Sequence, residues 1–169
     1  MRNLSLVLLL SVLALGSNTV HAQNTAANRI PPYKKVAGWP PLDLLMPDSS
    51  RFTKADLKKQ PTLIMYFSPD CDHCIHQMED MNKRIKEFSK YQVVMVTNQP
   101  MIDLVDFIHK FNLGGKENFK IGKDDKFQLP GFYAIKALPF FAIYNKDGKI
   151  LSTHESNTSV DVLLKDLKK

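Results

Sequence analysis

Cysteine is scarce in this chain, since only Cys71 and Cys74 occur among 169 residues. A protein that relies on disulfide bonds for stability would carry more cysteines at longer spacing. A disulfide across two intervening residues would close a very small loop and add little to the free energy of unfolding. The pair is therefore predicted to serve chemistry rather than stability.

Other absences exclude whole classes of function. The formal net charge is +6, but the lysines are scattered among acidic residues and form no basic stripe with interleaved aromatics. This pattern is typical of a solvated surface, so no nucleic-acid partner is expected. A c-type haem site needs histidine directly after the second cysteine, and Ile75 stands there instead.

The first 22 residues have the three parts of a secretory signal. Arg2 is the positive end, residues 4–15 are apolar, and residues 20–22 offer a small-residue cleavage site. The apolar stretch has roughly a dozen residues, short of the ~20 that span a bilayer, and no cysteine follows it that could carry a lipid. We expect residues 1–22 to be removed, leaving a periplasmic or otherwise exported, soluble protein that does not span the membrane. An uncleaved N-terminal anchor is the alternative.

The mature chain is predicted to contain an arm and one domain. Residues 23–41 are polar and include two proline pairs, which favours an extended arm. Trp39, the only tryptophan, is expected to pack this arm against the body. Residues 42–169 form the domain, whose length suits a single hydrophobic core.

The stretch around the cysteines indicates the chemistry. Residues 63–67 are apolar and of strand length, Ser68-Pro69-Asp70 is predicted to turn, and an amphipathic helix pattern begins at the cysteines. Cys71 would then lie at the helix start, where unpaired N–H groups and the helix dipole stabilise a thiolate. Cys74 would follow one turn later on the same face, within reach for a disulfide. These features predict a redox-active dithiol.

The remaining patterns predict a mixed sheet with helices on both faces, an α/β fold. An N-terminal β-hairpin is expected at 42–45 and 51–53, a helical turn at 54–60, further strands at 92–97, 119–121, 138–144 and 149–153, and a helical stretch at 132–137. Three amphipathic helices are also expected. The helix after the cysteines would bury Cys74, Met78, Met81, Ile85 and Phe88, and the next would bury Ile102, Val105, Ile108 and Phe111. The last helix, capped by Thr158 or Ser159, would bury Val160, Leu163, Leu164 and Leu167.

The chain resembles the thioredoxin superfamily, and within it the exported TlpA/ResA-like thiol–disulfide oxidoreductases. The strand followed by Cys71-Asp-His-Cys74, the Ala137-Leu-Pro139 segment and the Asn145-Lys-Asp-Gly148 turn carry the resemblance. It implies a thioredoxin-like fold in which Pro139 is the cis-proline beside the active site. The backbone of Leu138 would then pair with an extended substrate.

The resemblance also implies a role for each cysteine. Cys71 would attack a substrate disulfide and Cys74 would resolve the mixed disulfide. The dithiol would need no cofactor and no metal, and its partners would be exported cysteine-containing proteins and a redox donor or acceptor protein. His73 is expected to lower the pKa of Cys71 by hydrogen bonding to the thiolate, whereas Asp72 opposes that effect.

Three departures from the family pattern leave the direction of electron flow open. Met65 replaces the buried acid of many thioredoxins, Gln77 replaces the glutamate of reducing envelope members, and Asp70 replaces the usual aromatic. Asp70, Asp72 or Glu79 is an alternative proton acceptor.

Other functions remain as alternatives to the oxidoreductase. A copper metallochaperone would use both cysteines with His76 or His154, and a binding module would keep the fold without turnover. A peroxidase using Cys71 lacks the threonine that peroxiredoxins carry three positions before the cysteine, and Ser68 at that position is only a weak signal for this activity. Four ligands of a structural zinc would be too crowded on one helical turn.

Overall fold

The computed structural model describes residues 30–169. The predicted signal peptide, residues 1–22, lies outside the described residues, as do residues 23–29 of the predicted arm.

A seven-stranded mixed sheet with the strand order β2-β1-β5-β4-β3-β6-β7 forms the centre of the fold. Strands β3, β4 and β5 are parallel, and all other neighbouring strands are antiparallel. The predicted α/β sheet and its N-terminal hairpin are confirmed. The strands are β1 (Asp43–Leu45), β2 (Arg51–Thr53), β3 (Thr62–Tyr66), β4 (Gln92–Thr97), β5 (Phe119–Lys123), β6 (Phe140–Tyr144) and β7 (Ile150–Glu155).

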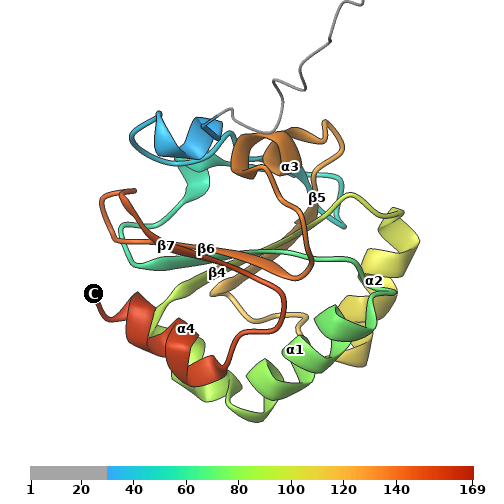
Figure 1. Cartoon of the computed structure of the whole chain (residues 1–169). Coiled ribbons are helices and arrows are strands. Elements are labelled where there is room, and N and C mark those ends of the chain that lie inside the picture. The colour runs from blue at the N-terminus through green and yellow to red at the C-terminus, as the bar shows by residue number, and fades with distance from the viewer. Residues whose placement is uncertain (1–29) are drawn as a thin grey trace, which may run out of the picture.

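Helices cover both faces of this sheet. Figure 1 shows α1, α2 and α4 on one face, and α3 with the N-terminal segment on the other. The α-helices are α1 (Asp72–Lys83), α2 (Met101–Lys110), α3 (Gln128–Tyr133) and α4 (Val160–Leu167), and short 3₁₀ helices occupy Pro32–Lys34, Lys54–Asp56 and Ile85–Lys90.

The core consists of two apolar layers separated by the sheet. Alternate residues of β3 enter opposite layers because side chains of a strand alternate between its faces. Leu63 and Met65 join the layer under α1, α2 and α4, whereas Ile64 and Tyr66 join the layer under α3. Every residue of β3, β4 and β6 is buried, as expected for central strands that are covered on both sides.

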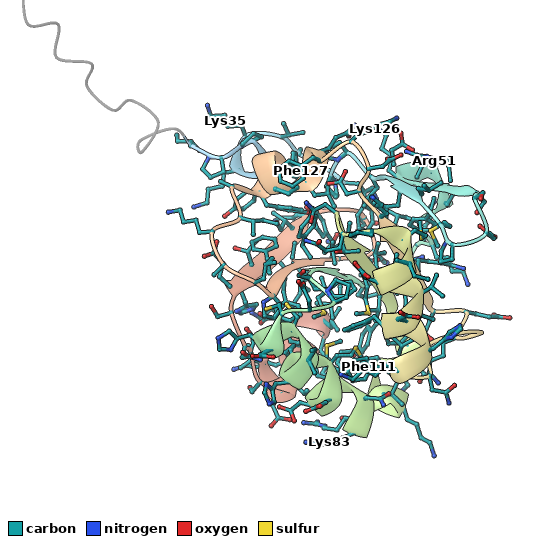
Figure 2. The ribbon with its side chains drawn as sticks, turned by 90° about the vertical axis from the view of Figure 1, so that its right-hand side faces the viewer. Lys35, Arg51, Lys83, Phe111, Lys126 and Phe127 are labelled. Carbon is teal, nitrogen blue, oxygen red and sulfur yellow. The ribbon has the colours of Figure 1, made fainter. Side chains whose placement is uncertain are left out.

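The N-terminal hairpin is joined to the loop before α3 by ion pairs. Arg51 contacts Asp43 at 2.7 Å and Asp125 at 2.8 Å, and Lys126 also pairs with Asp43. Figure 2 shows Arg51 and Lys126 close together at this side of the molecule. Since these groups are partly exposed, each pair contributes modestly to stability, but together they hold β1 and β2 in register with the loop.

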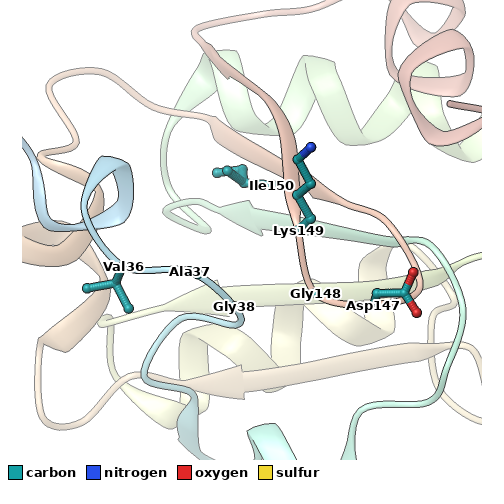
Figure 3. Close-up of a pocket in the computed structure, with 7 residues that line it drawn as sticks. All are labelled: Val36, Ala37, Gly38, Asp147, Gly148, Lys149 and Ile150. Carbon is teal, nitrogen blue, oxygen red and sulfur yellow. The ribbon is translucent and has the colours of Figure 1, made fainter.

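The described part of the N-terminal arm packs onto the domain through aromatic residues, as predicted for Trp39. The Trp39 ring lies 5.1 Å from that of Tyr144, and Tyr33 lies 5.7 Å from Tyr133 (centroid distances). A pocket of about 300 Å³ remains between residues 36–38 and residues 147–150 (Figure 3). The turn that lines it follows the end of β6, opposite to the end where Pro139 lies, so this pocket is remote from the cysteines.

Two predicted helical segments have other bounds in the structure. The helix after the cysteines ends at Lys83, and a 3₁₀ helix carries Ile85 and the fully buried Phe88. Apolar residues three positions apart also lie on one side of a 3₁₀ helix. The spacing of the apolar residues therefore did not reveal that the α-helix ends at Lys83. The helical stretch predicted at 132–137 is found earlier, as α3.

Of the apolar stripe predicted for α2, the burial of Phe111 is confirmed, but the face that carries Ile102, Val105 and Ile108 is not the buried one. Ile102 is 65% exposed and Val105 and Ile108 are only partly buried, whereas Leu104 and Phe107 are buried. The Phe107 ring lies 4.6 Å from the ring of Phe67 and 4.7 Å from that of Phe111. Burial of aromatic rings removes more apolar area from water than burial of the Ile and Val side chains, which favours the observed face.

Candidate active site

Cys71 is the N-cap residue of α1, at the end of the turn that leaves β3. Its backbone is extended (φ −85°, ψ 119°), and no side chain caps the helix. The N–H of Cys71 donates to the Ser68 carbonyl at 3.2 Å, and its own carbonyl accepts from Ile75 at 2.9 Å, which begins the helix. The Cys71 thiol is free and partly exposed. It therefore lies at the exposed start of the helix, where another sulfur can reach it.

Cys74 lies one helical turn further on and is completely buried, with a free thiol. Burial raises the pKa of Cys74 to about 12. A hydrogen bond with Cys71 and the negative charge of Asp70 also raise this pKa, whereas a hydrogen bond from the Ser68 backbone lowers it. Cys74 is thus a protonated thiol in contact with Cys71. One cysteine is accessible and the other is shielded, as an attacking and a resolving cysteine require.

The turn before Cys71 is held by a side-chain hydrogen bond. Ser68 is buried, and its hydroxyl donates to the exposed Asp70 carboxylate. Of the three proton acceptors considered from the sequence, Asp70 acts on the pKa of Cys74, whereas Asp72 and Glu79 are exposed on the surface of α1. Met65, at the position of the acid found in many thioredoxins, is also fully buried, but its thioether is only a weak acceptor and cannot take the Cys74 proton.

The two histidines near the cysteines are exposed. Nδ1 of His76 is 2.8 Å from the carbonyl of Asp72. The backbone carbonyl of His73 accepts a hydrogen bond from Asn157 at 2.9 Å, but among the described residues no hydrogen bond joins its ring to Cys71. The modulating roles of Asp72 and His73 therefore stay predictions.

Leu138 and Pro139 lie beside the end of β3 from which the cysteine turn departs. Phe140, the first residue of β6, pairs with Tyr66, the last residue of β3. The Leu138–Pro139 peptide bond is cis, as the family resemblance implied, and Pro139 is buried. Within residues 30–169 the backbone of Leu138 makes no hydrogen bond, so an extended chain can pair with it.

One contact at the site was missed by sequence reasoning. Gln77 was considered only as a replacement for a glutamate, but it is buried, and its side-chain oxygen accepts a hydrogen bond from the Thr158 backbone at 2.8 Å. A polar residue on the buried stripe of an amphipathic helix was the available signal, because a buried amide requires a partner.

The described residues contain no group of three or more histidine, cysteine and acidic side chains that could hold a metal ion. His154, one of the additional ligands considered for copper, instead lies 2.9 Å from the buried carboxylate of Asp166. None of the helices in residues 30–169 has the length and apolar character needed to cross a bilayer.

The sheet order, the dithiol at the start of α1 and the cis-proline beside it define a protein of the thioredoxin-like fold. Over residues 39–153 the sequence matches the AhpC/TSA family, and the chain belongs to this family. No protein of curated function has a matching sequence.

Solved structures with the same fold include proteins described as thioredoxins or disulfide oxidoreductases. A protein from Neisseria meningitidis assigned as a thioredoxin has a TM-score of 0.64 at 20% identity, covering 79% of this chain and 89% of its own. A secreted disulfide oxidoreductase of Mycobacterium tuberculosis, described as homologous to DsbE of E. coli, has a TM-score of 0.62 at 17% identity, covering 75% and 94%. A protein from Chlorobium tepidum assigned as the thiol:disulfide interchange protein DsbE has a TM-score of 0.63 at 21% identity, covering 79% and 96%. The fold is thus that of thioredoxin-like thiol–disulfide oxidoreductases.

Proposed function

We propose that this protein is an exported thiol–disulfide oxidoreductase of the TlpA/ResA-like type, which exchanges disulfides with protein substrates through Cys71 and Cys74. The observation that carries the proposal is the pairing of an accessible Cys71 at a helix N-terminus with a buried, hydrogen-bonded Cys74. The sequence features of residues 1–22 and the secreted relative from Mycobacterium tuberculosis support export.

The reaction proceeds in two exchanges. The Cys71 thiolate attacks one sulfur of a client disulfide, the client S–S bond breaks, and the released client thiolate takes up a proton. The Cys74 thiol then loses its proton and attacks the sulfur of Cys71, which releases the second client thiol and leaves a Cys71–Cys74 disulfide. Two electrons pass from the dithiol to the client, and the same steps in reverse oxidise a client dithiol.

The first exchange prepares the second. The Cys71 sulfur is one of the causes that raise the pKa of Cys74, and this contribution ends when Cys71 enters the mixed disulfide. The pKa of Cys74 therefore falls when its thiolate is needed. Asp70 is the carboxylate whose charge acts on Cys74, and we assign it to the exchange of the Cys74 proton with solvent.

The clients are exported proteins with cysteines, and a redox donor or acceptor protein restores the starting state. The dithiol is the redox centre, so no cofactor enters the reaction. An extended client segment is expected to pair with the backbone of Leu138 while its sulfur meets Cys71.

An equilibrium redox titration of residues 23–169 tests the proposal, with the mass increase after alkylation as the readout. A potential near −270 mV indicates a reductant of thioredoxin type, and a value towards about −120 mV indicates an oxidant or isomerase. A protein that forms no internal disulfide in any buffer contradicts the proposal and favours metal binding. Loss of disulfide exchange with unchanged client binding in Cys71→Ser separates the oxidoreductase from a binding module.

A further inference from the structure

The segment between β7 and α4 forms a third side of the site. Glu155, the last residue of β7, pairs with Phe140, which directly follows Pro139. Phe140 also pairs with Tyr66, the last residue of β3 before the cysteine turn. The chain that leaves β7 therefore starts beside Pro139, and Figure 1 shows that it leads to α4 on the face of the sheet that α1 also covers. None of the groups in the proposed reaction lies on this segment.

Asn157, in this segment, binds the peptide group between the two cysteines. Its side-chain Nδ2 donates to the backbone carbonyl of His73 at 2.9 Å. This carbonyl belongs to the peptide unit whose nitrogen is that of Cys74, so the bond acts on the backbone that carries the resolving cysteine. His73 lies in the first turn of α1, and the hydrogen bond joins it to a residue 84 positions later in the chain.

The backbone on both sides of Asn157 is fixed by hydrogen bonds. Ser156 has a φ of 64°, a left-handed conformation that residues other than glycine rarely adopt, and its carbonyl accepts the Thr158 hydroxyl at 3.2 Å. The Thr158 N–H donates to Gln77 at 2.8 Å, and Ser159 caps α4. A costly conformation persists only where the surrounding contacts hold it. These contacts hold the exposed Asn157 side chain where its amide meets α1.

The Asn157 bond concerns the second exchange rather than the first. Cys71 precedes the helix and is held by its own backbone bonds, to the Ser68 carbonyl and from the Ile75 N–H. Cys74 must instead bring a buried sulfur onto the sulfur of Cys71, with which it is hydrogen-bonded in the reduced protein. The rate of an intramolecular attack depends on the distance and angle between the reacting atoms. The position of the Cys74 backbone therefore affects how fast the mixed disulfide is resolved.

We propose that Asn157 is a positioning residue of the dithiol, whose side-chain amide holds the His73–Cys74 peptide so that Cys74 is aligned for attack on the Cys71 mixed disulfide. Asn157 acts through the backbone of Cys74 and not on a reacting atom. This inference rests on the proposed oxidoreductase function and adds a residue that determines the rate of its second step.

The two exchanges can be measured separately by rapid mixing of the reduced protein with 5,5′-dithiobis(2-nitrobenzoate), a symmetric aryl disulfide. The Cys71 thiolate attacks one sulfur of the reagent, the aryl S–S bond breaks and the first coloured aryl thiolate leaves. The Cys74 thiol then loses its proton and attacks the Cys71 sulfur, which releases the second aryl thiolate and leaves the Cys71–Cys74 disulfide. Only the first phase depends on the reagent concentration, so at high concentration it becomes the faster of the two.

Asn157→Ala should slow the second phase about fivefold, the effect of one net hydrogen bond, and should leave the first phase unchanged. Asn157→Asp keeps the shape of the side chain but, when ionised, has no donor, so it should slow the second phase at least as much. Asn82→Ala, the same substitution in the last turn of α1, is the matched control and should leave both phases unchanged.

Three results would overturn the role of Asn157: a second phase at the wild-type rate in Asn157→Ala, a second phase at the wild-type rate in Asn157→Asp, or a parallel change of both phases. A parallel change would mean that the bond supports the whole start of α1 rather than the alignment of Cys74. The wild-type protein tests the oxidoreductase proposal separately. If it shows no second phase, the proposed function itself fails; if it shows both phases and the variants match it, only the role of Asn157 fails.

Discussion

The side-chain oxygen of Gln77 on α1 accepts a hydrogen bond from the backbone N–H of Thr158 at 2.8 Å. Thr158 lies 81 residues later in the chain, just before α4. Asn157 adds a second bond, to the carbonyl of His73 at 2.9 Å. These two bonds join the first turns of the helix that carries both cysteines to the segment that leads into α4. The position of the dithiol therefore depends on the C-terminal part of the chain.

Gln77→Ala should lower the free energy of unfolding by about 2 kcal/mol, because the Thr158 N–H loses its acceptor and a buried amide is removed. Gln77→Glu keeps an acceptor oxygen and should cost less. Urea unfolding followed by circular dichroism gives both values. Glu79→Ala on the exposed face of α1 is the control and should be close to neutral; an equal loss in Glu79→Ala and Gln77→Ala would show that the hydrogen bond to Thr158 does not account for the loss.

The two cysteines should react with alkylating agents at very different rates. Iodoacetamide at pH 8 is expected to modify Cys71 of the reduced, folded protein and to modify Cys74 ~100-fold more slowly, since thiolates are the reactive form. Cys74 is fully buried with a pKa of about 12, so almost no Cys74 thiolate is present at this pH. Peptide mapping by mass spectrometry identifies the modified residue. Unfolding in urea should make the two rates similar, and faster labelling of Cys74 in the folded protein would contradict the assignment of attacking and resolving cysteines.

The stability of the reduced protein should decline above about pH 9 because of Cys74. The usual pKa of a cysteine thiol is 9.0, and burial in the folded protein raises the pKa of Cys74 to about 12. Between these values the folded state binds more protons than the unfolded state, so the free energy of unfolding falls as pH rises. The contribution of Cys74 is present in full below pH 9 and is lost progressively towards pH 12, at about 1.4 kcal/mol per pH unit.

Cys74→Ala isolates this effect from the tyrosines whose pKa values are also raised, Tyr66, Tyr133 and Tyr144. The difference in unfolding free energy between the reduced wild type and Cys74→Ala should shrink between pH 8 and pH 10. A constant difference over this range would show that the Cys74 pKa is not raised in the folded state.

The turn between β6 and β7 requires glycine at position 148. Gly148 has a φ of +81°, and a Cβ atom there would lie 2.7 Å from Nε1 of Trp39. Gly148→Ala should therefore destabilise the protein by about 1–2 kcal/mol and displace the Trp39 indole, which tryptophan fluorescence reports.

Gly131→Ala is the matched control for this substitution. Gly131 lies within α3, and no atom lies within 4 Å of a Cβ built there. Alanine should be neutral or stabilise the protein by up to ~1 kcal/mol, because it favours helix more than glycine does. Thermal unfolding compares the two variants, and equal changes in Tm would contradict the role given to the φ value and the Trp39 contact.

Much of the fold could be predicted because its signals are local. The boundaries of β4, the turn at 145–148 and the Ser159 cap of α4 agree with the sequence patterns. The face of α2 could not be predicted, since Ile102, Val105 and Ile108 form as regular a stripe as Leu104, Phe107 and Phe111. The choice depends on Phe67, which lies on another element and packs against Phe107.

The candidate site divides in the same way. The positions of Cys71 and Cys74 followed from a strand, a turn and a helix that are adjacent in sequence. The burial of Cys74 was also predicted, from the apolar stripe of its helix, and is confirmed. The effects of Ser68, Cys71 and Asp70 on the pKa of Cys74 required the assembled fold. The partners of Gln77 and Asn157 are tens of positions away in the chain, and sequence reasoning did not find them.

The α/β architecture, the order of its elements and the redox-active pair of cysteines could be inferred from the residues alone, because hydrophobic periodicity, turn residues and helix-start preferences act over a few neighbouring residues. Which face of α2 is buried and which groups hold the start of α1 became clear from the folded structure alone. These features depend on packing between segments distant in sequence, where the shape and charge of one side chain matter only in relation to the others that surround it.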